Sequence, residues 1–302
     1  AKTPEALPPM AGDLPRNRLG LAKWLLADDN PLTTRVTVNR FWLELFGRGL
    51  VNTPSDFGLT GQTPSHPELL DWLAVELREK GWDIKAFYRM LVTSATYRQD
   101  AGIDARRLQK DPANVLLSRG PRFRMDGEMI RDHALAVSDL LSPKLGGPSV
   151  KPYQPDGVWE GVAMNESNTR NYQRDKGESL YRRSLYTFWK RSAPPASMEV
   201  FNAPNRQTCT IQRERGNTPI QALATLNDPQ LVESARNLAQ RVLLGVPAGD
   251  EAARLNAMAV KIISRPLRDT EITVLKNSLS EMQANYSAEP AEATALITLG
   301  ES

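Results

Sequence analysis

Apolar residues recur at helical spacing along most of the chain, and the strand-like alternation of polar and apolar residues is rare. Within residues 38–45, four apolar side chains stand at positions i, i+3, i+4 and i+7, which places them on one face of a helix. Asn30 and Pro31 have the order of a side-chain cap followed by proline at the first helical position, and Gly47 follows the apolar stretch. The pattern predicts a helix between these signals.

Two more helices are predicted over residues 67–94. Ser65 and Glu68 have the spacing of a capping box, and three leucines within residues 70–77 form the apolar face of the helix that follows. Gly81 ends this helix and Asp83 caps the next one. Helices joined by so short a turn form an αα-hairpin.

The helical pattern returns after this hairpin. One helix is expected from about Asp126 to Leu141, with Ile130, Ala134 and Val137 facing inward. Cap-and-proline pairs predict further helices that start near residues 219 and 229, and a last helical region starts near residue 270.

Residues 142–216 lack this pattern. They are rich in Pro, Gly, Asn and Arg, and only residues 185–189 have the composition of a short strand. The predicted fold class is therefore mainly α, a multi-helix domain with an αα-hairpin near the N-terminus and a loop-rich insert carrying a little β structure. We divide the chain into a lead-in (1–15), an N-terminal helical part (16–141), the insert (142–216) and a C-terminal helical part (217–302). We expect one integrated domain, truncated at both ends.

Composition narrows the chemistry. The 302 residues include one cysteine, Cys209, and two histidines. One cysteine excludes an internal disulfide, a C-x-x-C pair, a Cys-rich zinc site and covalent c-type haem, and two histidines exclude a three-His metal site. We expect no metal site and no cofactor in this chain. The 38 Lys and Arg exceed the 35 Asp and Glu by only 3, too little for nucleic-acid binding, and no apolar stretch is long enough for a transmembrane segment.

Both histidines and one isolated arginine have two interpretations. His66, beside Glu68, is a candidate base or ligand, but we favour the alternative of a simple helix start, since the capping box already explains the spacing. His133 flanks an apolar helix face and is expected to be a hydrogen-bonded structural residue. Arg40 is a candidate for binding a carboxylate, sulfate or phosphate, whereas an i,i+4 ion pair with Glu44 is the alternative that we favour.

Arginines and aromatic residues are interleaved in the insert. Guanidinium groups bind anions and aromatic rings stack on sugars, so this segment is the first place to look for a ligand site. The alternative is a structural network in which acids such as Glu178 and Glu199 neutralise the arginines. The ligand-binding candidates of the chain are Arg40, Arg182, Arg183, Tyr186, Trp189 and Arg213.

Several segments resemble one family. They are residues 38–42 (VNRFW), 46–51 (FGRGLV), 66–73 (HPELLDWL), 93–99 (TSATYRQ), 181–186 (YRRSLY) and 218–223 (TPIQAL). With these motifs the chain resembles the planctomycete domain-of-unknown-function family numbered fifteen fifty-three, over about residues 18–299.

The resemblance implies a context rather than a reaction. Members of this family usually form the C-terminal part of large exported proteins with a cytochrome c domain near the N-terminus, so the implied partners are other domains of the same polypeptide. Any haem would lie in that absent domain, the implied location is extracytoplasmic (periplasmic or cell surface), and a link to polysaccharide use is suspected. The family supplies no established active site, and Asn202 stands where its pattern leads us to expect an acid.

Two functions follow from these observations. The first is a non-catalytic module that docks to a redox domain and binds a glycan (a polysaccharide) or an anionic ligand. The second is a carbohydrate-active or redox-linked enzyme with His66 as base and Asp132, Asp156 or Glu160 as acids, where glycoside chemistry requires two carboxylates about 5–10 Å apart. Nucleic-acid binding through the αα-hairpin is disfavoured because its second helix has too few basic residues. We favour the module.

Overall fold

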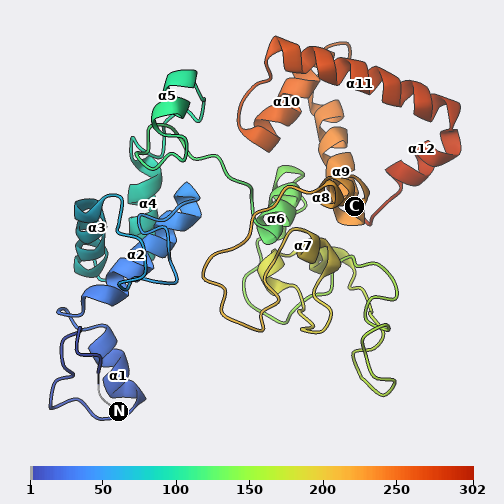
Figure 1. Ribbon diagram of the computed structural model, residues 1–302. Helices are drawn as coiled ribbons and strands as arrows, with labels where there is room; N and C mark the ends of the chain where they lie inside the picture. Colours follow the sequence, from blue (N-terminus) through green and yellow to red (C-terminus); the bar gives the residue numbers. More distant parts are fainter. Residues whose placement is uncertain (1–2) are drawn as a thin grey trace. The chain divides into compact units, whose positions relative to one another are not determined.

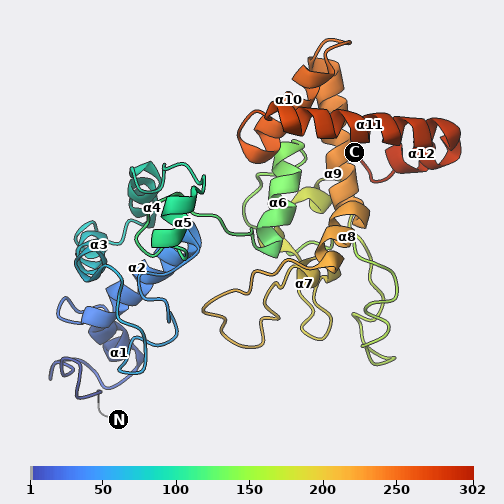
Figure 2. The ribbon, with the colours of Figure 1, turned by 45° about the horizontal axis from the view of Figure 1, so that its top comes forward.

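The computed structural model describes residues 3–302 and is mainly α-helical, as the sequence predicts (Figures 1 and 2). About 48% of the residues are helical and about 2% are in β structure. The α-helices are α1 (Arg18–Leu25), α2 (Pro31–Phe46), α3 (Pro67–Glu79), α4 (Ile84–Thr93), α5 (Ala105–Lys110), α6 (Gly127–Val137), α7 (Ala196–Val200), α8 (Pro219–Asn227), α9 (Pro229–Gly245), α10 (Glu251–Ile263), α11 (Asp269–Ala288) and α12 (Pro290–Ile297).

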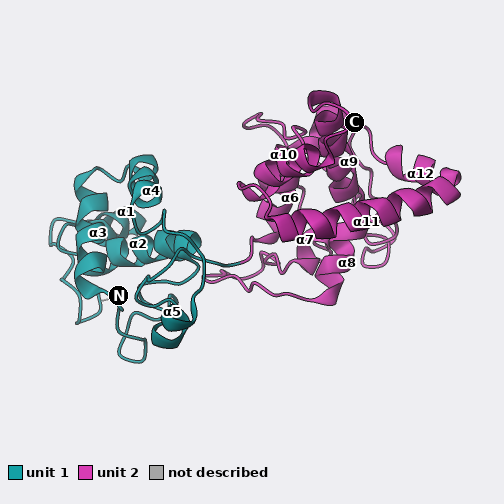
Figure 3. Cartoon of the chain, turned by 90° about the horizontal axis from the view of Figure 1, so that it is seen from above, with its two compact units in different colours: residues 1–123 teal, residues 124–302 magenta. Residues whose placement is uncertain are grey.

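The chain divides into two compact units, residues 1–123 (unit 1) and residues 124–302 (unit 2) (Figure 3). This boundary lies within the segment 16–141 that the sequence pattern groups together. Helix α6 belongs to unit 2 because it packs against α7, α9 and α10. Residues 3–15 of the expected lead-in contain turns and no helix, and residues 1–2 lie outside the described part of the chain.

Helices α2, α3 and α4 form the core of unit 1, and the two helices predicted over residues 67–94 are both present. The rings of Trp42 and Phe46 stack with their centroids 4.0 Å apart. The buried apolar residues of this core are Val38, Trp42, Phe46, Leu50, Val51, Leu70, Leu73, Leu77, Phe87 and Leu91.

The helix ends of unit 1 follow the sequence signals with one exception. The Asn30 side chain accepts a hydrogen bond from Leu32 N at the start of α2, and Gly47 ends α2 with a left-handed backbone (φ +72°) that favours glycine. The predicted capping box at α3 is wrong. His66 occupies the cap position, and its side chain makes no hydrogen bond to the start of the helix. The hydroxyl of Ser65, the residue predicted to cap the helix, lies within hydrogen-bond distance of His66 Nδ1, at 3.0 Å.

In unit 2, α9 packs against α6, α8, α10 and α12. The side chains of Thr218 and Asp228 cap α8 and α9, so both helices begin where the cap-and-proline pairs predict. His133 Nε2 lies 2.9 Å from the Ile262 carbonyl oxygen, which confirms the structural role expected for this histidine. No helix within residues 3–302 combines the length and the apolar character that a membrane crossing requires.

The inward face predicted for α6 is wrong by one position. Gly127, Arg131 and Leu135 are the buried residues of this helix, whereas Ile130 and Ala134 are only partly buried. A charged residue at the centre of a buried face contradicts the apolar pattern, and its hydrogen bonds explain why it is tolerated there.

Residues 142–216 are largely without regular structure, although α7 lies within them. The strand predicted over residues 185–189 is wrong: residues 184–186 form a 3-10 turn, and Thr187 makes a single parallel bridge to Val150. The chain there is fixed by side chains that reach in from α6 and α9 rather than by a neighbouring strand.

Candidate functional site

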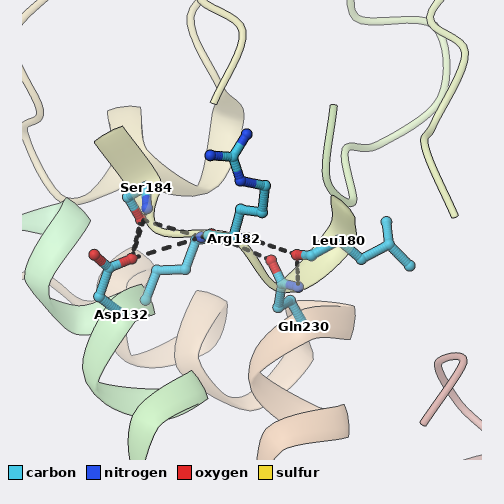
Figure 4. Close-up of polar contacts among 6 residues, drawn as sticks. Asp132, Leu180, Arg182, Ser184 and Gln230 are labelled. Atoms are coloured by element: carbon cyan, nitrogen blue, oxygen red, sulfur yellow. Dashed lines mark hydrogen bonds and ion pairs between the residues drawn. The ribbon is translucent and has the colours of Figure 1, made fainter. Parts of the chain in front are cut away.

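Arg131 is a buried residue of α6, with a relative exposure of 6%. Figure 4 shows Leu180, Arg182, Ser184 and Gln230, the residues to which its hydrogen bonds run. Its Nε donates to Gln230 Oε1 at 2.7 Å, its Nη2 donates to the Leu180 carbonyl at 2.8 Å, and its Nη1 donates to the Arg182 carbonyl at 2.8 Å and to Ser184 Oγ at 3.2 Å. One guanidinium therefore ties α6 to α9 and to residues 180–184.

The acid Asp132, a predicted catalytic candidate, takes part in the same network. Its Oδ1 accepts hydrogen bonds from Ser184 N and Ser184 Oγ, both at 2.7 Å, and lies 3.6 Å from Arg131 Nη1. Burial lowers the pKa of Arg131 to about 10, and the carboxylates of Asp132 and Asp228 oppose that shift, so Arg131 is charged at neutral pH. Through these contacts Asp132 holds Ser184 against α6, which is a structural role.

The predicted ligand-binding residues Arg182 and Tyr186 contact each other. Arg182 is 4% exposed, its Nη1 donates to the Pro148 carbonyl at 3.0 Å, and its guanidinium lies 3.8 Å from the centre of the Tyr186 ring. The Tyr186 hydroxyl accepts from Gly146 N at 2.8 Å. Both side chains hold residues 144–148 in place.

Trp189 and Arg213 also make internal contacts. Trp189 Nε1 donates to the Asn205 carbonyl at 3.2 Å, with the Arg206 guanidinium 4.2 Å from its ring centre. Arg213 Nη1 donates to Glu128 Oε2 at 2.6 Å. The arrangement follows the structural-network alternative for this segment more closely than the ligand-site alternative.

The remaining sequence candidates are distributed over both units. Arg40 is exposed on α2 and His66 is partly buried at the start of α3, both in unit 1. Arg183 is exposed and Glu160 is partly buried in unit 2. Among residues 3–302, no three His, Cys, Asp or Glu side chains gather in a way that would hold a metal ion.

A small cavity of about 20 Å³ lies beside Arg131, with room for one water molecule. Thr187, 5% exposed, lines it, and its buried hydroxyl has no hydrogen-bond partner among residues 3–302. The buried Nε2 of Gln154, which also lines the cavity, likewise has no partner in this part of the chain. The Asp228 carboxyl also lines the cavity, and burial raises its pKa. The cavity is polar but too small for an organic ligand.

Replacing Thr187 by valine is expected to raise the free energy of unfolding by about 1 kcal/mol, because it removes an unpaired buried hydroxyl and keeps the side-chain shape. Thr187→Ser, the matched control, keeps the hydroxyl and loses a methyl group, so we expect it to destabilise. Urea denaturation measures both. A destabilised Thr187→Val variant would contradict the prediction and show that the hydroxyl has a bonded partner.

Unit 1 contains a larger hollow, of about 260 Å³, which we call the Arg48–Arg122 hollow. It lies between residues 46–50 at the end of α2 and residues 112–123, with Ser65 and Ile103 completing the wall. Its charged lining residues are Arg48, Arg119 and Arg122. Its apolar lining includes Trp42, Phe46, Leu50, Ile103, Leu117 and Phe123.

The loop that carries Arg48 is fixed by Asn39, a fully buried residue of α2. Asn39 Nδ2 donates to the Val51 carbonyl at 3.0 Å, and Asn39 Oδ1 accepts from Val51 N at 2.8 Å. A Cβ on Gly49 would stand 2.9 Å from the Asn39 amide, so glycine permits this close approach. Ser65 N donates to the Leu50 carbonyl at 2.9 Å, which brings the start of α3 to the same loop.

The opposite wall is held by Asp111 and Arg119, which are 5% and 7% exposed. The Asp111 carboxylate accepts from Val115 N at 2.7 Å and Leu116 N at 3.0 Å, and Arg119 Nη1 donates to the Asp111 carbonyl at 2.8 Å. Both walls are therefore fixed by buried polar side chains.

The charge of the hollow is not compensated locally. No Asp or Glu lines it. Within residues 3–302, neither Arg48 nor Arg122 has a hydrogen bond or an ion pair, whereas the Arg119 guanidinium donates to the carbonyl oxygens of Asp111 and Pro112 in its own loop. The imbalance extends to the whole unit, because residues 1–123 contain 17 Lys and Arg against 14 Asp and Glu, and residues 124–302 contain 21 of each.

The family model described as PSD1, "Protein of unknown function (DUF1553)", matches residues 17–279. The chain belongs to the DUF1553 family. The match spans most of both units and agrees with the resemblance carried by the sequence motifs. No curated protein and no solved structure is similar enough to this DUF1553 chain to count as a match.

The sequence pattern of this DUF1553 chain does not mark Arg48, Arg122 or Arg131 as site residues. For Arg48 the sequence contains one signal of a binding role: it stands between two glycines in the loop just after a helix, and binding residues often lie on such loops. Arg131 had none, because its hydrogen-bond partners Leu180 and Gln230 are 49 and 99 residues away in the sequence.

Proposed function

We propose that this chain is a non-catalytic binding module that takes up a small anion in the Arg48–Arg122 hollow. One observation carries the proposal: a hollow of about 260 Å³ is lined by no acidic residue and by two guanidinium groups, Arg48 and Arg122, that have no hydrogen-bond or ion-pair partner among residues 3–302. Guanidinium groups bind carboxylates, sulfates and phosphates through charge-assisted hydrogen bonds, which are strongest where water is partly excluded.

This proposal keeps the anionic ligand expected from the sequence and moves its site. The insert is a weaker candidate because Arg182 and Arg213 already donate to protein oxygens. Such internally paired guanidinium groups would have to lose existing hydrogen bonds to bind a ligand.

The wider context proposed here comes from the family resemblance. The module would belong to an exported planctomycete protein, dock to a cytochrome-type domain of the same polypeptide, and act outside the cytoplasm in polysaccharide use. The alternative of a carbohydrate-active or redox-linked enzyme has less support, since the candidate acid Asp132 is already bonded to Ser184.

The anion site is tested by titration calorimetry of the purified chain with sodium sulfate, acetate and benzoate at low ionic strength. We expect at least one of these salts to bind at one site, and Arg48→Gln or Arg122→Gln each to weaken binding by about tenfold. Arg106→Gln, on the exposed face of α5 away from the hollow, is the control and should bind like the parent. Unchanged binding in the Arg48→Gln/Arg122→Gln double variant would overturn the proposal.

A further inference from the structure

We infer that the ligand of the Arg48–Arg122 hollow is a small amphiphilic anion, a carboxylate that carries a compact ring or branched apolar body. This inference rests on the proposed function and specifies its ligand class. It follows from the apolar residues in the lining, from the volume of the hollow and from the absence of lining acids.

The apolar part of the lining is available for contact. Ile103 lines the hollow and is 46% exposed, and Leu117, also in the lining, is partly buried against the core of unit 1. An inorganic anion would leave these surfaces in water. A ligand with an apolar body would cover them and gain free energy in proportion to the apolar area removed from water.

The volume sets the size of that body. A hollow of about 260 Å³ lies just below the range of about 300–1,000 Å³ that is usual for sites of drug-sized ligands and cofactors. It is more than ten times the cavity of about 20 Å³ beside Arg131, which holds a single water molecule at most. A single ring with one anionic group suits this volume, whereas a dinucleotide or an oligosaccharide does not.

The polar groups of the hollow suit a carboxylate as the anionic group. The guanidinium fork matches the two oxygens of a carboxylate. Ser65 and Asn114 also line the hollow and are neutral. Asn114 Nδ2 donates to the Arg119 carbonyl at 2.9 Å, so this amide is already oriented. No group in the lining would repel a negative charge.

The test compares probes that differ in one property each. Sodium benzoate and cyclohexanecarboxylate carry both an anion and a ring, sodium acetate and sulfate carry the anion alone, and benzyl alcohol carries the ring alone. We expect the two ring carboxylates to bind at least about tenfold more tightly than acetate or sulfate, and benzyl alcohol to bind more weakly than benzoate by a similar factor.

Variants separate the two parts of the ligand. Ile103→Ser is expected to weaken benzoate binding severalfold and to leave acetate unchanged, whereas Arg48→Gln weakens both. Leu108→Ser, an equally exposed leucine on α5 outside the hollow, is the matched control and should change neither. The melting temperature of each variant confirms that it is folded.

The outcomes distinguish this inference from the proposed function. If acetate or sulfate binds as tightly as benzoate and depends on Arg48, the anion site stands and the amphiphilic ligand is wrong. If benzyl alcohol binds as tightly as benzoate, the ligand is apolar and the role of the anion is wrong. If no anion depends on Arg48 and Arg122, the proposed function fails together with this inference.

Discussion

Replacing Arg131 by alanine is expected to lower the free energy of unfolding of unit 2 by about 3–5 kcal/mol, a large part of what a single domain has. The substitution removes the guanidinium that donates hydrogen bonds to the Arg182 carbonyl and to Gln230 Oε1. Both acceptors would then be buried without this donor. Asp132 would also lose its nearest positive charge, 3.6 Å away. Guanidinium chloride denaturation followed by circular dichroism measures the loss.

Two further variants separate the role of Arg131 from a general effect of removing charge. Arg183→Ala removes an exposed arginine of the same unit and should change stability by no more than about 0.5 kcal/mol. Arg131→Lys keeps the charge but not the planar fork that reaches both α9 and residues 180–184, so it should be destabilised as well. An Arg131→Ala protein as stable as the parent would show that the network is not what holds unit 2 together.

The second large effect is expected at Asn39 in unit 1. Asn39→Ala leaves the buried N–H and carbonyl of Val51 without partners, and each such group costs about 1–3 kcal/mol, so we expect a loss of about 2–4 kcal/mol. The loop with Arg48 would lose its anchor, and anion binding should weaken even at temperatures where the variant remains folded.

The matched control is Arg40→Ala, at the next position of α2, where the side chain is exposed. We expect it to stay within about 0.5 kcal/mol of the parent. Differential scanning calorimetry measures stability, and benzoate titration below the melting temperature measures the site. If Asn39→Ala binds benzoate with the affinity of the parent, then the Val51 contact does not position Arg48.

The helices of unit 1 were predictable from the sequence because local signals agree there. The apolar face of α3, the caps at Asn30 and Asp83, and the glycine after α2 all act over a few residues. The mainly α fold class follows from the same agreement. The predicted capping box at α3 was wrong because the spacing of Ser65 and Glu68 alone does not decide which side chain bonds to the backbone.

The polar parts of both units were not predictable in this way. Asn39 and Arg131 lie on buried helix faces that a hydrophobicity pattern assigns to apolar residues, and the partners that make them tolerable lie on other segments. The hollow has the same origin, since Arg48 and Arg122 come from loops that only the folded core brings together. Long-range hydrogen bonding, rather than periodicity, determines these positions.

The separations spanned by the Arg131 hydrogen bonds bear on the order in which the chain acquires its structure. The core of unit 1 joins residues within the range 38–91, whereas Arg131 bonds to Gln230, 99 residues further along the chain. Loop-closure entropy must be overcome before contacts of such long range form. Unit 1 is therefore expected to fold early and locally, and residues 142–216 to gain their fixed path only after α6 and α9 have paired.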